Sequence, residues 1–153
     1  MIRSVERTGN GIVSIIPMRR AHLARVRELS VQLGYENAPS ELAERFALLR
    51  RDKNHRMFVA LLDGKVAGWM HVAARKLLQA EFRLEILGLV VDAGLRGRGV
   101  GRALLEHAQC YARENGFKMV SLYSGAKRLA AHRFYARCGY VHSKNSKVFV
   151  KKI

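Results

Sequence analysis

The spacing of hydrophobic residues changes along the chain, and the order of these changes predicts a mixed α/β protein. Short apolar runs bounded by turn residues are typical of strands, and apolar residues three and four positions apart are typical of one helix face. Strands are predicted over 11–17, 56–63, 64–75, 82–92 and 118–124, with further strand material at 140–143 and 146–152. Helices are predicted over 18–35, 41–51, 99–115 and 127–138. This order gives a sheet of six to seven strands and about four helices.

Turn signals and connection lengths indicate how the strands pair. Asp63-Gly64 is a tight hairpin signal between two predicted antiparallel strands. Strand 82–92, helix 99–115 and strand 118–124 form a βαβ unit, so these two strands are predicted to be parallel. No repeat, linker or low-complexity stretch interrupts the 153 residues. We therefore expect a single domain, 1–153.

The stretch "LGLVVDAGLRGRGVGR" (87–102) joins an apolar strand to a helix through bare backbone and positive charge. Its notable residues are Arg96, Gly97, Arg98, Gly99, Val100, Gly101 and Arg102. The first N–H groups of a helix have no partner within the helix and favour an anion. Glycines let backbone come close to phosphate oxygens, so the loop is predicted to hold a pyrophosphate.

Three other interpretations of this loop were weighed. A P-loop requires a lysine followed by serine or threonine, and none is present. A dinucleotide fingerprint fails because its third glycine position is Arg102 or Leu104, depending on the starting glycine. A glycine-rich turn without a ligand is the remaining alternative.

Composition adds an excess of positive charge. Lysine and arginine number 28 against 12 acidic residues, a formal charge of +16. Such a field attracts anions, although it is also a general feature that promotes solubility. The basic residues are scattered in pairs, so no disordered nucleic-acid-binding arm is indicated. No apolar run approaches the ~18–20 residues of a membrane helix, and no secretory signal is visible, so we expect a cytoplasmic protein without membrane contact.

Two motifs together resemble the GNAT superfamily of acyl-CoA-dependent N-acetyltransferases. The first is R-x-x-G-x-G at Arg96–Gly101, and the second is A-x-x-F-Y-x-x-x-G-[FY] at Ala131–Tyr140. The element order over nearly the whole chain is also similar. The C-terminal half, with R-x-x-A-H-x-F-Y at Arg128–Tyr135 and K-x-S-x-V-F at Lys144–Phe149, resembles small bacterial members of an aminoglycoside-acetyltransferase-like subgroup.

The resemblance implies a GNAT fold in which a splayed parallel strand pair receives the acetyl-CoA arm. By position, this implies that backbone of Leu89, Val90 and Val91 pairs with the arm, while their side chains pack in the core. The resemblance places the pyrophosphate on Arg96 through Arg102. Many members carry asparagine where this chain has Arg128, and Arg128 is assigned to the CoA phosphates or a substrate carboxylate.

The resemblance also implies catalytic roles for two residues. Tyr135 matches the tyrosine that protonates the departing thiolate; its alternative is a core aromatic residue beside Phe134. Glu85 lies where some members carry the general base. The alternative for Glu85 is a surface glutamate on the polar face of an alternating strand. In that case Glu81 or a path of water molecules would take the proton. His71 is interpreted as a packing or surface residue, and its alternative is a residue that faces the expected acceptor site.

The expected reaction is acetyl transfer from the cosubstrate acetyl-CoA to a primary amine of a small molecule or peptide. The acceptor site is expected around 33–40, 71–78 and the predicted C-terminal strand. The charge of +16 disfavours polycationic aminoglycosides and favours an amino acid, an acidic metabolite amine or a peptide amine. Two other classes stay open: a basic nucleic-acid-associated protein, which no motif supports, and a catalytically silent acyl-CoA sensor. No metal site is expected, and the resemblance implies a possible homodimer.

Overall fold

The computed structural model describes residues 4–9 and 11–153, which form two compact units divided after Tyr123. Each unit is described by itself below. The first holds a sheet and three α-helices, and the second holds one α-helix and the C-terminal segment. The expectation of a single domain over the whole chain stays a prediction.

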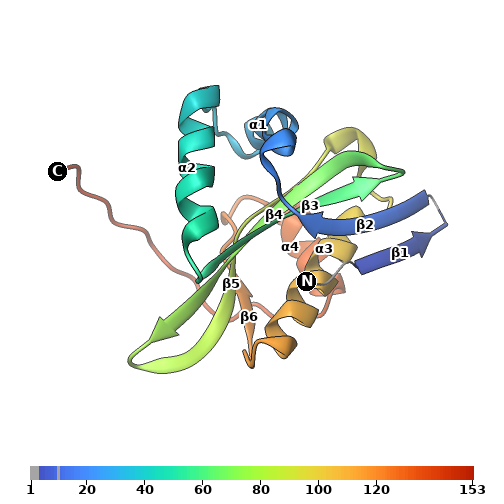
Figure 1. Cartoon of the computed structure of the whole chain (residues 1–153). Coiled ribbons are helices and arrows are strands. Elements are labelled where there is room, and N and C mark those ends of the chain that lie inside the picture. The colour runs from blue at the N-terminus through green and yellow to red at the C-terminus, as the bar shows by residue number, and fades with distance from the viewer. Residues whose placement is uncertain (1–3, 10) are drawn as a thin grey trace. The chain divides into compact units, whose positions relative to one another are not determined.

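The first unit is built on a six-stranded sheet whose strands follow chain order (Figure 1). The strands are β1 (Ser4–Thr8), β2 (Gly11–Pro17), β3 (His55–Leu62), β4 (Lys65–Leu77), β5 (Ala80–Val91) and β6 (Val120–Leu122). All neighbours are antiparallel except β5 and β6, which are parallel. The hairpin at Asp63-Gly64 has positive φ at both residues, as its sequence predicted.

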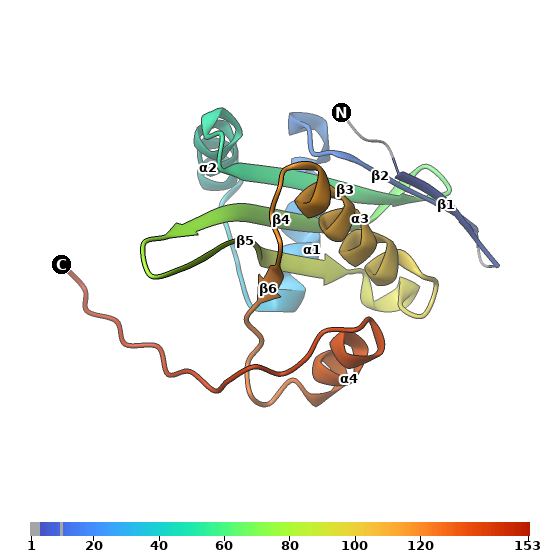
Figure 2. The same cartoon turned by 90° about the horizontal axis from the view of Figure 1, so that it is seen from below.

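Helices cover both faces of this sheet (Figure 2). In chain order they are the 3-10 turn η1 (Arg20–His22), α1 (Leu23–Ser30), η2 (Val31–Leu33), α2 (Pro39–Arg51), η3 (Ala93–Leu95) and α3 (Val100–Glu114). On one face, Val26 of α1 and Phe46 of α2 pack with Val59 of β3. On the other face, the Phe58 ring meets the rings of His107 and Tyr111 of α3 edge-on. Alternate residues of β3 therefore serve two separate cores.

The second unit contains α4 (Leu129–Arg137) and no strand. Gly139 follows the helix with φ of 84°, and the N–H groups of Gly139 and Tyr140 donate to the carbonyls of Ala136 and Tyr135. This is the glycine-ended helix stop that the sequence predicted.

The structure differs from the sequence prediction in three elements. β1 was not predicted, because its one apolar residue described, Val5, is 61% exposed and gives no apolar run. The helix predicted over 18–35 is divided into η1, α1 and η2. The strands predicted at 140–143 and 146–152 are wrong: this segment has no regular structure, and Val148, Phe149 and Val150 are exposed. Its alternating pattern suits a strand, but among the described residues no strand pairs with it.

Gly68 allows β4 and β5 to approach closely. A Cβ built at Gly68 would lie 2.7 Å from the carbonyl oxygen of Val90. We expect Gly68→Ala to lower the free energy of unfolding by about 1–3 kcal/mol, because backbone must move to relieve this clash. Chemical denaturation measures the effect. Gly125→Ala is the control, since a Cβ there meets nothing closer than 3.9 Å, and an equal loss in both variants would contradict the prediction.

Candidate functional site

The edge of β5 loses its parallel neighbour halfway along the strand. β6 pairs with β5 only from Leu84 to Ile86, and a bulge at Leu87 follows. In the part of the chain that the structure describes, Leu89–Val91 pair with β4 alone. Val90 is buried, so side chains can pack while the backbone edge is left for an added extended group.

The loop after β5 ends in an uncapped helix N-terminus. Gly97 and Gly99 have φ of 79° and 84°, a left-handed conformation that favours glycine. Gly99 is the N-cap residue of α3 and provides no side-chain hydrogen bond. The first N–H groups of α3 are thus available to an anion, where the helix dipole also favours negative charge.

The other loop residues can contribute either a backbone N–H group or a side-chain charge to an anion. Gly101 lies inside the first turn of α3, within the helix that the sequence predicted over 99–115. The Val100 side chain is buried, so only its N–H can serve an anion. Arg96, Arg98 and Arg102 are exposed, and Arg102 pairs with Glu106 at 3.1 Å. The arginines supply charge, and the backbone supplies the defined geometry.

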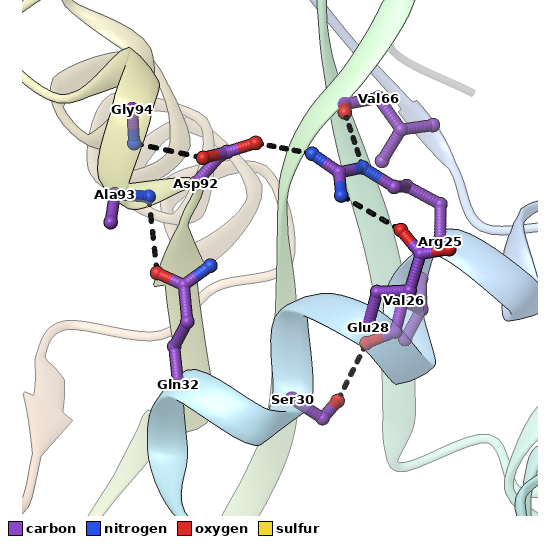
Figure 3. Close-up of polar contacts among 9 residues, drawn as sticks. All are labelled: Arg25, Val26, Glu28, Ser30, Gln32, Val66, Asp92, Ala93 and Gly94. Atoms are coloured by element: carbon purple, nitrogen blue, oxygen red, sulfur yellow. Dashed lines mark hydrogen bonds and ion pairs between the residues drawn. The ribbon is translucent and has the colours of Figure 1, made fainter.

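A polar network ties the start of this loop to α1 and η2 (Figure 3). The Asp92 carboxylate accepts a hydrogen bond from the Gly94 N–H at 2.9 Å, and its other oxygen pairs with Arg25. Arg25 also pairs with Glu28 at 2.8 Å, and the Glu28 and Asp92 carboxylates raise the pKa of the guanidinium against the effect of burial. Gln32 accepts from the Ala93 N–H at 3.1 Å. Two helical segments therefore fix where the loop begins.

We expect Asp92→Asn to loosen this loop. The change removes the charge that pairs with Arg25, and it should cost about 1–2 kcal/mol of unfolding free energy because the pair is partly buried. Denaturation measures this cost, and Glu28→Gln, which removes the exposed partner of Arg25, is the control with an expected change below about 0.5 kcal/mol. Equal effects of the two variants would argue against a role for the network.

Glu85 lies in the sheet on the face that α1 and α2 cover. It is 4% exposed, so the surface alternative considered for it is wrong. One oxygen, Oε2, pairs with Arg75 of β4. In the register of the sheet, Glu85 of β5 is opposite Ala73 of β4, and Ala73 is opposite His55 of β3. Ala73, a small and buried residue, therefore lies between these two polar residues in the register of the sheet.

His71 is part of a polar chain that the sequence interpretation missed. His55 Nδ1 and His71 Nε2 are 2.8 Å apart and share a hydrogen bond. His55 Nε2 lies 3.8 Å from an Asp52 oxygen. Burial, with the neighbouring His55, lowers the pKa of His71 to about 4. No local motif marks this pair of histidines. Because alternate residues of a strand share a face, His71 lies on the same face of β4 as Trp69, and this spacing could have placed His71 on the face that α1 and α2 cover.

Trp69 lies beside His71 on the same face of β4. Its ring lies against Gly88, where a Cβ would be 2.8 Å from two ring carbons. Its Nε1 is buried and has no hydrogen-bond partner among the described residues. A buried donor without a partner is costly, so this N–H favours an acceptor atom from a ligand.

The second unit holds the two remaining predicted site residues. Arg128 is the N-cap residue of α4, and Tyr135 lies on the same helix between the rings of Phe134 and Tyr140, at 5.4 and 6.2 Å. Burial raises the pKa of the Tyr135 hydroxyl, and Arg128 opposes this shift. The association of both residues with the loop of the first unit stays a prediction.

Two other kinds of site were sought in residues 4–9 and 11–153. No three or more His, Cys, Asp or Glu side chains gather as metal ligands there. No helix in this part of the chain has the length and apolar character to cross a membrane.

Comparisons with known proteins converge on one family. The sequence profile described as "Acetyltransferase (GNAT) family" matches residues 23–140. An aminoalkylphosphonate N-acetyltransferase of Salmonella typhimurium is 37% identical over 99 residues, 64% of each chain. An N-acetylaspartate synthetase of Homo sapiens is 32% identical over 85 residues, 56% of this chain and 27% of that one. An uncharacterized N-acetyltransferase of Methanocaldococcus jannaschii is 35% identical over 95 residues, 61% and 42% of the two chains. The chain thus spans less than two thirds of each relative's length.

Solved structures share the fold. A transcriptional regulator from Bacillus halodurans superposes with a TM-score of 0.82 at 24% identity, covering 91% of this chain and 99% of that one. The aminoglycoside N-acetyltransferase AAC(6')-Iy, in complex with CoA, has a TM-score of 0.82 at 16% identity, covering 100% and 99%. At these identities the likeness shows the fold alone.

Proposed function

The chain belongs to the acetyltransferase (GNAT) family, and from this premise we propose that it transfers an acetyl group from acetyl-CoA to the amine of a small molecule. One observation carries the proposal: left-handed Gly97 and Gly99 lead into an uncapped α3 directly after a strand edge with no parallel partner. These features support an anion site beside a backbone edge in one continuous stretch of chain. A pyrophosphate joined to an amide-containing arm has the matching chemistry.

The residues present fit the cosubstrate. Backbone N–H groups of Gly97–Arg102 hold the pyrophosphate, and the exposed arginines of the loop add charge. The open edge at Leu89–Val91 receives the amide groups of the arm. Arg128 is proposed as a further phosphate partner from the second unit. When bound, acetyl-CoA supplies the reactive acetyl thioester.

The chain's own groups then serve the reaction. A backbone N–H of Leu89–Val91 polarises the acetyl carbonyl by hydrogen bonding. Glu85 is buried, and its Oε2 pairs with Arg75; its carboxylate is proposed to attract the protonated amine. Glu85 is also a candidate for the general base that takes the proton of the amine. Tyr135 gives its hydroxyl proton to the leaving sulfur, and its raised pKa keeps it protonated at neutral pH.

The acceptor is proposed to be an amine that also carries an acidic group. The formal charge of +16 attracts anions and repels polycations. Two of the relatives are named for amines with an acidic group, an aminoalkylphosphonate and aspartate. An acceptor that carries a phosphonate, phosphate or carboxylate group therefore agrees both with the positive charge of the chain and with the names of these relatives.

Acetyl-CoA calorimetry followed by a thiol-release screen tests the function. The amine panel contains matched pairs with and without acidic groups, aspartate with its diamide and 2-aminoethylphosphonate with ethanolamine, and it also contains kanamycin. We expect micromolar binding, with kcat/KM for acidic acceptors about tenfold or more above their neutral partners. Faster acetylation of kanamycin would contradict the acceptor class. Binding without transfer to any amine would favour a catalytically silent acyl-CoA sensor, and the absence of binding would overturn the proposal.

A further inference from the structure

A chain of three polar side chains runs from the surface to the middle of β4. Asp52 ends α2 and is 45% exposed, His55 begins β3, and His71 lies within β4. The contacts are His55 Nε2 to Asp52 Oδ2 at 3.8 Å and His55 Nδ1 to His71 Nε2 at 2.8 Å. Each histidine uses one ring nitrogen toward the other, so the direction of this hydrogen bond decides what His71 presents at its remaining nitrogen, Nδ1.

Asp52 selects one of the two possible directions. Its carboxylate oxygen lies 3.8 Å from His55 Nε2, and at this distance its negative charge, not a hydrogen bond, favours a proton on that nitrogen. A neutral His55 then has a bare Nδ1, which accepts from His71 Nε2–H. A neutral His71 with its proton on Nε2 has a lone pair at Nδ1. His71 is neutral near pH 7 because burial and the neighbouring His55 lower its pKa to about 4.

The sheet register places His71 next to the proposed acetyl-transfer site. His71 is opposite Gly88 of β5, directly before the open edge at Leu89–Val91. Trp69, with its unpartnered Nε1, lies two residues away on the same face, opposite Val90. One region of the sheet is thus bordered by the lone pair of His71 Nδ1, the unpartnered Nε1–H of Trp69 and the open backbone edge at Leu89–Val91.

The charged groups around His71 leave it as the available base. On its face, β3 contributes His55, β5 contributes Glu85, and β4 contributes Arg75, which pairs with Glu85. From α1, Arg25 is engaged by Asp92 and Glu28. The Glu85 carboxylate is thus engaged by Arg75, as Arg25 is engaged by Asp92 and Glu28.

We infer that His71, oriented by His55 and Asp52, accepts the proton of the acceptor amine; this inference rests on the proposed function. As the nitrogen bonds to the acetyl carbon it becomes positively charged and acidic. Its N–H bond breaks, the electron pair stays on nitrogen, and the proton joins His71 Nδ1. His71 is then an imidazolium whose Nε2–H still donates to His55 Nδ1, and it returns the Nδ1 proton to solvent when the product leaves, which restores the starting tautomer.

Nitrogen-15 NMR of the ligand-free protein tests the arrangement without any substrate. At pH 7 we expect both His71 and His55 to carry their proton on Nε2 alone. In Asp52→Asn, the negative charge that favours a proton on His55 Nε2 is lost, so part of the proton population on both histidines should move to Nδ1. His132, which contacts the Gly125 carbonyl in the other unit, is the internal control and should not change. A wild-type His71 protonated at Nδ1 would overturn the inference.

Kinetics separates this inference from the proposed function. With the acceptor that wild type uses best, we expect His71→Gln to lower kcat about 10²–10³-fold with acetyl-CoA affinity unchanged by calorimetry, because general-base catalysis is lost. Asp52→Asn, which changes a half-exposed residue and should fold normally, should lose about tenfold. An unchanged kcat in His71→Gln, with a loss only in Glu85→Gln, would overturn this inference and leave acetyl transfer standing. A wild type that acetylates no amine would overturn both.

Discussion

Gly99→Glu should weaken acetyl-CoA binding by at least about 100-fold, which corresponds to about 2.7 kcal/mol. Gly99 has φ of 84°, a conformation that costs other residues about 1–2 kcal/mol. The added carboxylate would also lie at the N-terminus of α3, where it would occupy the N–H groups proposed for the pyrophosphate and repel its charge. Isothermal calorimetry with acetyl-CoA measures the change in affinity.

Gly116→Glu is the matched control for this experiment. Gly116 follows the other end of α3, has φ of 75°, and has open space where a Cβ would lie. It therefore carries a similar backbone strain and the same added charge, away from the loop. We expect both variants to lose stability, by thermal unfolding, while only Gly99→Glu loses affinity. Equal loss of affinity in both would mean that the α3 N-terminus is not the anion site.

Tyr135→Phe should lower kcat about 10²–10³-fold and leave acetyl-CoA affinity unchanged. The substitution removes the hydroxyl that is proposed to protonate the leaving sulfur, and general-acid catalysis is typically worth this much. Since burial raises the pKa of Tyr135 above its usual value of 10, the wild-type rate should show no loss of this acid until the solution is more alkaline than pH 10. Steady-state thiol release over pH 6–10 measures both quantities.

Tyr140→Phe controls for removing a phenol from the same unit. Its ring lies 6.2 Å from that of Tyr135, yet the sequence assigns it to the end of the motif and not to the acid role. We expect kcat of this variant to stay within about threefold of wild type. A large loss of kcat in Tyr140→Phe with none in Tyr135→Phe would mean that Tyr140, and not Tyr135, is the general acid.

The sequence by itself predicted most of the strands and helices and the glycine loop that is proposed as the anion site. Hydrophobic periodicity is a local property, so the long strands β3, β4 and β5 and helix α3 were predicted within a few residues of their bounds. The Asp63-Gly64 hairpin and the glycine loop were also visible, because positive φ requires particular residues at particular positions. The βαβ connection was enough to predict that β5 and β6 are parallel.

Tertiary structure decided which side chains meet. His55 and His71 are 16 residues apart and come together only through the register of β3 and β4. Arg25 and Asp92 are 67 residues apart, on a helix and at a strand end. Glu85 looked like the polar half of an alternating strand, but helices on both faces of the sheet bury both halves. Spacing along the chain gives the face on which a side chain lies, whereas register, bulges and packing determine its neighbours.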